Sequence, residues 1–141
     1  MGNTGFDSQA IERAEQALKA LAINFQEWMT AEVEKLEIAR AHARLELYSS
    51  ATLEALYNAA HDVKGLGTTY DYPFITTIAG NLCRLLESAE GRKASRESPS
   101  LIDMHVDVIR AVLRNDIRTA EDPTVGAMVA ALKTRVDRWA A

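Results

Sequence analysis

Hydrophobic residues recur along the first third of the chain at alternating spacings of three and four positions. This spacing places them on one side of a helix and predicts helical structure over residues 8–47. The positions are Ile11, Ala14, Leu18, Leu21, Phe25 and Trp28. After Trp28 the pattern changes phase and continues through Met29, Val33 and Leu36.

The predicted length of this first helix is unusual for the chain. Unbroken, residues 8–47 would span about 60 Å, whereas the later helices would span roughly 25–33 Å. We therefore expect either a break or bend near Asn24–Thr30, or an end that protrudes.

Three prolines mark the starts of later helices, because proline at the first helical position loses no hydrogen bond. Helices are predicted to begin near Pro73, Pro99 and Pro123. Ser98 and Asp122 precede two of these prolines and are suited to accept a hydrogen bond from a free backbone N–H. A further helix over residues 51–69 should follow a cap at Ser49-Ser50. Gly91 is expected to end the helix that begins at Pro73, with residues 91–98 as a polar loop.

No segment alternates hydrophobic and polar residues long enough to predict a strand. The expected fold is all-α, an antiparallel bundle with short connections. Residues 1–7 are expected to be a flexible N-terminus and residues 8–34 a helical extension. Residues 35–141 are expected to form the bundle.

Composition narrows the class of function. The 141 residues carry a net charge of −4, which disfavours nucleic-acid binding, and a single cysteine, Cys83, which allows no internal disulfide. The sequence shows neither a membrane-spanning run nor a secretory signal, so a cytoplasmic location is expected.

One histidine stands out when residues 51–69 are placed on a helical wheel. The hydrophobic face consists of Leu53, Leu56, Ala60, Val63 and Gly67. His61 lies about 120° from the centre of that face, and Lys64 and Gly65 are its neighbours on the surface. An exposed glycine inside a helix costs about 1 kcal/mol relative to alanine, so clearance beside His61 is a natural reason for Gly65. A neutral imidazole is a nucleophile towards phosphorus, and Lys64 supplies a cation for phosphoryl oxygens.

The His61-x-x-Lys64-Gly65 pattern, with Gly67 and a following helix, resembles the histidine phosphotransfer (HPt) domain family of multi-step phosphorelays. The resemblance implies an antiparallel four-helix bundle over residues 35–141. It also implies phosphorylation of His61, stabilisation of the phosphoryl group by Lys64 and clearance by Gly65. Leu66 and Asp71 depart from the commoner family pattern, while Tyr72-Pro73 resembles a bacterial subgroup.

The resemblance also implies the partners. They are a response-regulator receiver domain and a sensor or hybrid histidine kinase, with Mg²⁺ bound by the receiver domain and no cofactor on this chain. Tyr57, Asn58 and Thr68 share the side of the helix that carries His61 and are candidates for the docking surface, together with Gly65. The chain has no glycine-rich phosphate-binding loop, so we expect a phosphotransfer intermediate and not a self-contained kinase. A monomer is favoured over a homodimer.

Two other functions remain open. His42, His61-Asp62 and Asp107 follow the order of metal ligands in HD-type phosphohydrolases, although Asp62 points away from His61 on the wheel. The chain could instead be a helical interaction or scaffold module, in which residues 8–47 pair between subunits through Ile11, Leu18, Leu21, Phe25 and Trp28. His42 and His105 are otherwise expected at the surface or at the edge of the bundle.

Overall fold

The computed structural model describes residues 4–139, and every regular element in that range is a helix. The expected all-α fold is confirmed. The elements are α1 (Thr4–Leu45), α2 (Ser50–Thr69), α3 (Pro73–Glu87), α4 (Ala89–Glu97), α5 (Ser100–Arg114) and α6 (Pro123–Asp137).

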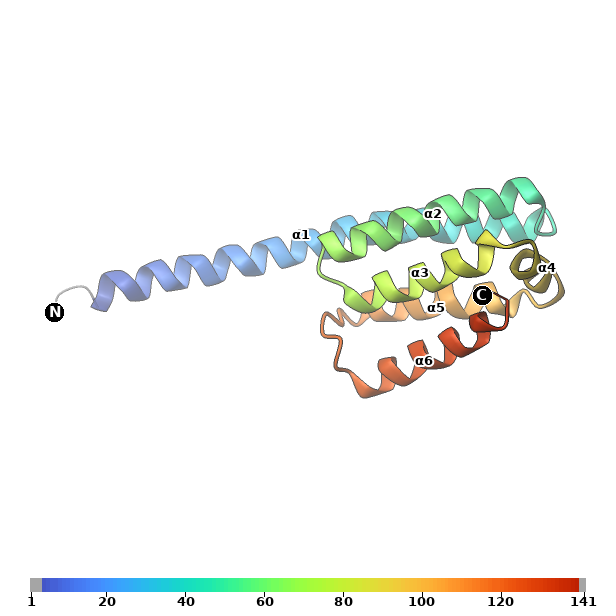
Figure 1. Cartoon of the computed structure of the whole chain (residues 1–141). Helices are drawn as coiled ribbons and strands as arrows, with labels where there is room; N and C mark the ends of the chain where they lie inside the picture. The colour runs from blue at the N-terminus through green and yellow to red at the C-terminus, as the bar shows by residue number, and fades with distance from the viewer. Residues whose placement is uncertain (1–3, 140–141) are drawn as a thin grey trace.

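Four of these helices pack around a common core. Helix α1 contacts α2 and α5, and α3 contacts the same two helices from the other side. Helix α6 packs outside this group against α3 and α5, and the short α4 crosses one end. Figure 1 shows α2 lying beside the C-terminal half of α1, while the N-terminal half of α1 projects beyond the other helices.

Helix α2 carries His61, and its buried residues agree with the helical-wheel prediction. Its N-terminus is capped by Ser49, whose side chain accepts a hydrogen bond from the backbone N–H of Thr52. The buried residues are Leu53, Leu56, Ala60, Val63 and Gly67, which is the predicted hydrophobic face. This burial fixes the rotation of α2 about its axis, and it leaves His61 exposed to solvent.

Helix α1 is continuous, so no break occurs near Asn24–Thr30, and the alternative of a protruding end is what the structure shows. The expected end of the extension, residue 34, lies inside α1. Among the described side chains of α1, the first buried one is that of Met29. Of the expected flexible N-terminus, residues 1–3 lie outside the described residues, and α1 begins at Thr4.

The guanidinium of Arg118 anchors α1 at the point where this helix leaves the bundle. It donates hydrogen bonds to the carbonyl oxygen of Ala22 on α1 (2.6 Å) and to that of Tyr70, after α2 (3.2 Å). It also bonds to the carboxylate of Asp116 (2.9 Å) and lies over the ring of the buried Tyr72. One side chain therefore ties together α1, the α2–α3 turn and the loop before α6.

The predicted helix starts at Pro73 and Pro123 are confirmed, and Asp122 caps α6 by accepting from the N–H of Val125 (2.9 Å). Helix α5 begins at Ser100, one residue later than its proline. The predicted cap at Ser98 is wrong, because Pro99 occupies the N-cap position and no side chain bonds there.

The expected loop over residues 91–98 is also wrong, because most of it belongs to α4. Helix α3 ends at Glu87, and Ser88 starts a new helix by accepting from the N–H of Gly91 (2.9 Å). Gly91 is buried against the backbone of Leu85, where a side chain would collide with the carbonyl group. The polar side chains that suggested a loop bind backbone carbonyls instead. Arg92 bonds to Leu86, and Arg96 bonds to Tyr48.

Within the described range, no helix combines the length and the hydrophobicity needed to cross a membrane.

Candidate functional site

His61, Lys64 and Gly65 lie on the outer side of α2, and all three are exposed. The ring of Tyr57, one turn earlier, lies 6.2 Å from the imidazole ring of His61 between centroids. Because the hydrophobic face of α2 is buried on the opposite side, these residues face solvent on a helix that cannot rotate. The structure therefore brings the three predicted residues together on an accessible surface.

The two glycines of this segment have different reasons for being glycine. A Cβ built on Gly65 would meet nothing within 4 Å, so packing does not require a small residue there. A Cβ on Gly67 would lie 2.9 Å from the backbone nitrogen of Thr76, at the closest approach of α2 and α3. Gly67 is therefore structural, whereas the chain's own fold gives no reason for Gly65.

Three contacts fix how α3 runs beside α2. The hydroxyl of Thr76 donates to the carbonyl oxygen of Lys64 (3.0 Å), and the Lys64 side chain lies over Gly80. The Tyr57 hydroxyl donates to the carboxylate of Glu87 (3.2 Å). Along α2, His61 lies between Tyr57 and Lys64. Along α3, Cys83 and Arg84 lie between Gly80 and Glu87. Since the helices are antiparallel neighbours, His61 and Arg84 lie at the same level of the pair.

A cavity of about 260 Å³ lies beside Lys64, between α2, α3 and α6. Its polar and charged lining includes Lys64, Asn81, Arg84, Glu87 and Lys133, and its other lining residues include Gly80, Cys83, Val129 and Leu132. Apart from Lys64 and Cys83, the sequence analysis did not single out these residues. The spacing of Gly80, Arg84 and Glu87 by four and three positions, which places them on one side of α3, is the signal that could have found them.

The orientation of Arg84 is set by a chain of hydrogen bonds that begins in the core. The ring Nδ1 of His105 bonds to the carbonyl oxygen of Leu101 (2.6 Å), which can only accept, so Nδ1 carries the proton. The Asn81 amide therefore donates to His105 Nε2 (2.8 Å) and accepts from Arg84 through its oxygen (3.0 Å). Arg84 also donates to the carboxylate of Asp137 (2.8 Å).

His105 itself was expected at the surface or at the edge of the bundle, and that expectation is wrong. The side chain is completely buried, with both ring nitrogens hydrogen-bonded. Burial lowers the pKa of His105, and the bond to Leu101 opposes this effect only in part. The imidazole is therefore held neutral, as a structural group and not as a surface base.

Cys83 lies next to the candidate site but is a poor nucleophile. It is almost fully buried, and burial raises the pKa of its thiol to about 11, although the nearby Lys64 acts in the opposite direction. The thiol is therefore protonated at neutral pH, as expected for a small hydrophobic residue of the core.

The other candidate docking residues surround this site. Asn58 and Thr68 are exposed, and Tyr57 is half-buried. The Thr68 hydroxyl lies 3.3 Å from that of Thr76 on α3, within hydrogen-bonding distance. Together with Gly65 these residues form the exposed outer side of α2, which we call the α2 face.

The residues of the metal-enzyme alternative do not converge. Across residues 4–139, no three His, Cys, Asp or Glu side chains are placed so that they could hold a metal ion together. His42 is exposed on α1, and the Asp107 carboxylate accepts a hydrogen bond from Arg40 (2.7 Å).

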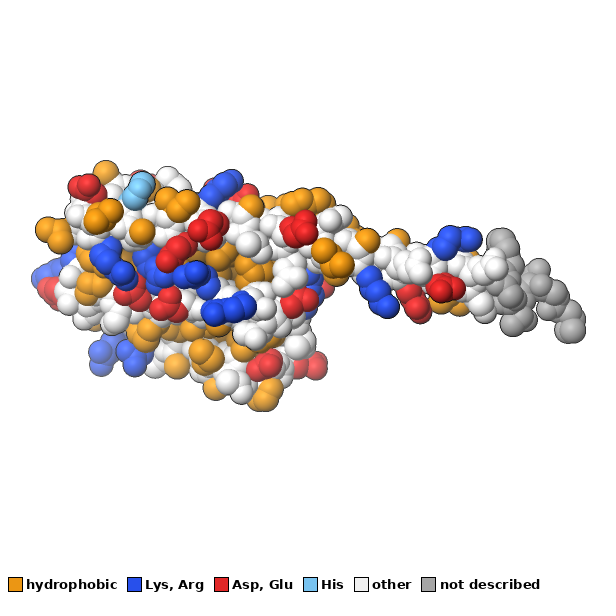
Figure 2. Space-filling model, turned by 180° about the vertical axis from the view of Figure 1, so that it is seen from behind, with side chains coloured by type: hydrophobic (Ala, Val, Ile, Leu, Met, Phe, Trp, Pro, Cys, Tyr) orange, Lys and Arg blue, Asp and Glu red, His pale blue; other side chains and the backbone are white. Residues whose placement is uncertain are grey.

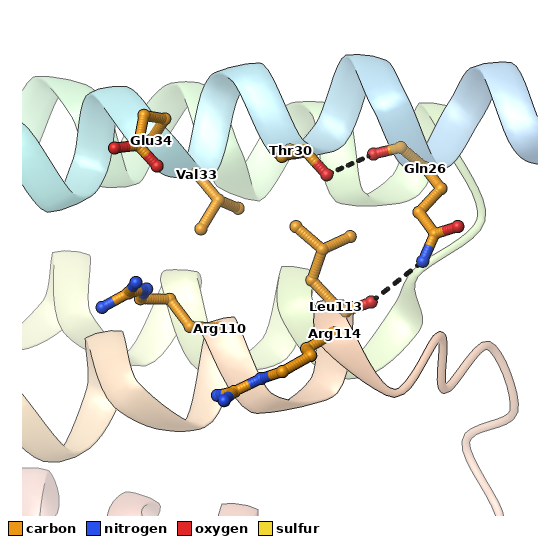
Figure 3. A pocket seen from close by; sticks show the side chains of 7 residues that line it. All are labelled: Gln26, Thr30, Val33, Glu34, Arg110, Leu113 and Arg114. Carbon is orange, nitrogen blue, oxygen red and sulfur yellow. Dashed lines mark hydrogen bonds between the residues drawn. The ribbon is translucent and has the colours of Figure 1, made fainter.

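A second cavity, of about 350 Å³, lies between α1 and α5 (Figure 3). Within it Gln26 donates to the carbonyl oxygen of Leu113 (3.3 Å), and Thr30 donates to that of Gln26 (2.7 Å). Its charged side chains are Glu34, Arg110 and Arg114, and none of the predicted site residues lines it. The bond from Gln26 to Leu113 joins α1 to α5, which gives this cavity a structural explanation.

Comparison of the chain with protein-family models, with curated proteins and with solved structures finds no match.

Proposed function

We propose that this chain is a histidine phosphotransfer protein of the four-helix HPt type. It accepts a phosphoryl group on His61 and relays it to or from an aspartate of a response-regulator receiver domain. The observation that carries the proposal is the open space at Gly65, one helical turn from an exposed histidine. A glycine that its own fold does not require, and that weakens an exposed helix, is explained if another protein must approach that surface.

The fold supports the proposal by presenting His61 on a rigid element. Helix α2 is held by its buried face and by its contacts with α1 and α3. A phosphoryl transfer between two proteins depends mainly on positioning and charge stabilisation, so a fixed helix suits it better than a loop.

The transfer requires only the imidazole and the partner. A ring nitrogen of His61 attacks the phosphorus of the phosphorylated aspartate with its lone pair. The bond from phosphorus to the carboxylate oxygen breaks as the bond to nitrogen forms, and the partner recovers its carboxylate. The proton on the other ring nitrogen stays or passes to water. While it stays, the ring is positively charged and leaves readily in the reverse transfer.

Lys64 supplies positive charge beside the reacting group. Its ammonium lies at the end of a flexible chain that crosses Gly80, one turn along α2 from His61. The cavity next to it is also lined by Arg84 and Lys133, which both donate hydrogen bonds to the carboxylate of Asp137. Their charges are therefore partly neutralised, and Lys64 is the cation that we assign to the phosphoryl oxygens.

Phosphotransfer from a labelled receiver domain tests the proposal. We expect an acid-labile, base-stable phosphoryl adduct on the wild-type chain and none on His61→Gln. The matched control is His42→Gln, since His42 is also exposed but lies on α1. Labelling of His61→Gln at the wild-type level, or no labelling of the wild type by a panel of receivers, would contradict the proposal.

The role of Gly65 in leaving space for a partner can be tested separately. Gly65→Arg should leave the fold intact, because a Cβ at this exposed position meets no atom within 4 Å, and should slow transfer strongly. Gly126→Arg is the control, because that glycine also has no neighbour within 4 Å but lies on α6. Equal transfer rates for the two variants would remove the clearance argument.

A further inference from the structure

The N-terminal half of α1 exposes large hydrophobic side chains without any partner in the described chain. Ile11 is 59% exposed, Leu18 66% and Leu21 41%. Figure 1 shows this part of α1 beyond the end of the bundle, and Figure 2 shows hydrophobic side chains along it, among charged ones.

These side chains follow the repeat of a coiled coil. The spacing of three and four positions repeats without interruption, which gives a period of 3.5 residues and places the six residues in one seam. The seam residues are Ile11, Ala14, Leu18, Leu21, Phe25 and Trp28. The last two pack on the chain's own Tyr70, at 5.3 Å and 5.7 Å between ring centroids. The seam therefore lies on the side of α1 that faces the bundle. Its first four positions extend beyond the bundle, so the bundle does not cover them.

The flanks of the seam allow a second helix to come close. Ala10, Ala17 and Ala22 border it, and Glu15 is the single charged residue among its bordering positions from residue 10 to residue 24. A partner with a different sequence is usually selected by charges at such positions. This seam has almost none, so nothing in it requires a complementary chain or forbids an identical one.

The surrounding structure determines the direction of pairing. In a parallel pair, the second helix would run along the seam to Phe25 and Trp28, where Tyr70 already lies. An antiparallel pair centred on Gln16 reaches the contact with Tyr70 only at its last residue, Phe25, and places the two bundles at opposite ends. Ile11 then meets Leu21 of the second copy, and Ala14 meets Leu18 of the second copy, so that large residues face smaller or equal ones.

We propose that residues 7–25 of α1 bind the same segment of a second copy as an antiparallel two-helix coiled coil. An isolated helix of this length is marginally stable in water, and pairing would supply the missing contacts. The sequence alone favoured a monomer, because it could not show that this stripe lies beyond the bundle.

The paired surface is small. About 27 Å of helix, at 1.5 Å per residue, presents only three large exposed hydrophobic residues on the seam, Ile11, Leu18 and Leu21. Stable interfaces bury roughly 1,200 Å² or more. Because so few large side chains take part, we expect a reversible dimer that dissociates on dilution.

Sedimentation of the full chain over a range of concentrations tests the proposal. The wild type should shift from monomer to dimer as concentration rises, whereas Leu18→Glu should stay monomeric. Ile23→Glu is the matched control, because Ile23 is 58% exposed on the same helix but lies opposite the seam. A wild type that is monomeric throughout, or equal effects of the two variants, would overturn the proposal.

The direction of pairing can be tested separately with Glu15. In the antiparallel pair the two Glu15 carboxylates lie within one helical turn of each other, so their repulsion weakens the dimer. Glu15→Gln should lower the concentration at which the dimer forms, and added salt should do the same for the wild type. An unchanged or higher midpoint would overturn the antiparallel arrangement. None of these variants touches His61, so phosphotransfer should persist in all of them and the two proposals can fail independently.

Discussion

At the scale of single residues, Gly65 and Gly67 show how one residue type serves two purposes within three positions. Gly67 lets the backbones of α2 and α3 approach, while Gly65 leaves the surface beside His61 empty. The sequence placed both residues correctly on the wheel, since one lies on the buried face and the other is exposed.

Substitution by alanine should separate these two roles. Gly65→Ala should stabilise the fold by up to about 1 kcal/mol, because alanine favours helix and meets no neighbour. Gly67→Ala should destabilise it by about 1–3 kcal/mol, because the methyl group presses on the backbone of Thr76. Urea denaturation of the two variants measures both changes, and the same sign for both would contradict this assignment.

The burial of particular polar residues at the site could not be predicted from the sequence. The burial of His105 depends on partners from two sources, the carbonyl of Leu101 on its own helix and the amide of Asn81 on α3. The first partner is local, but the second requires knowledge of how α3 and α5 pack. The cavity beside Lys64 was missed for the same reason, since its walls come from three helices.

At the scale of elements, the turn between α2 and α3 contains a residue in the left-handed region. Asp71 has a φ of 64°, a conformation that glycine adopts without strain and other residues adopt at a cost. Aspartate at this position departs from the resembled pattern, and the backbone shows that the turn tolerates it.

Asp71→Gly should therefore stabilise the chain by about 0.5–1 kcal/mol through relief of this strain. The same change at Asp62, an exposed position inside α2, should destabilise it by a similar amount because glycine disfavours helix. Thermal or urea unfolding of the two variants gives the comparison. A destabilised Asp71→Gly would show that the aspartate side chain contributes more than its backbone costs.

Helix starts were predictable because proline and capping residues act locally. Pro73, Pro123, Ser49 and Asp122 needed no tertiary information. The short α4 was not predictable in this way. Its residues are polar, and the helix is held by bonds from Arg92 to the backbone of Leu86, at the end of α3, and from Arg96 to that of Tyr48, before α2.

At the scale of the whole molecule, one chain of hydrogen bonds joins α5, α3 and α6. It runs from the buried His105 through Asn81 and Arg84 to Asp137, which also accepts from Lys133 (2.8 Å). Burial lowers the pKa of His105, and the bonds from Lys133 and Arg84 lower that of Asp137. Protonation of either group in acid therefore opposes the native arrangement.

The sign of the effect is the same for both groups. A histidine with a lowered pKa binds fewer protons folded than unfolded, so stability falls as pH drops below about 6.5. The contribution of Asp137 is lost only at lower pH, as its carboxylate is protonated. We expect the wild type to lose stability between pH 6.5 and 5.5 by up to about 1.4 kcal/mol more than His105→Gln, which cannot titrate.

Denaturation of both proteins at several pH values makes this comparison. Glutamine can still accept from Asn81, so the variant should fold, and its stability at pH 7.5 serves as the reference. Parallel curves for the two proteins between pH 7.5 and 5.5 would contradict a neutral, buried His105.

The anchoring of α1 by Arg118 has a consequence for how the molecule could work with partners. An unbroken helix that is anchored where it leaves the bundle is a stiff spacer. The N-terminal end of α1 therefore keeps a set position relative to His61. Joined through that end, two copies would form a bivalent carrier whose acceptor sites lie far apart and stay free of each other. A partner with two receiver domains would then engage both sites at once. The second contact would form at a high effective concentration, because a rigid spacer favours partners whose two domains are separated by a matching distance.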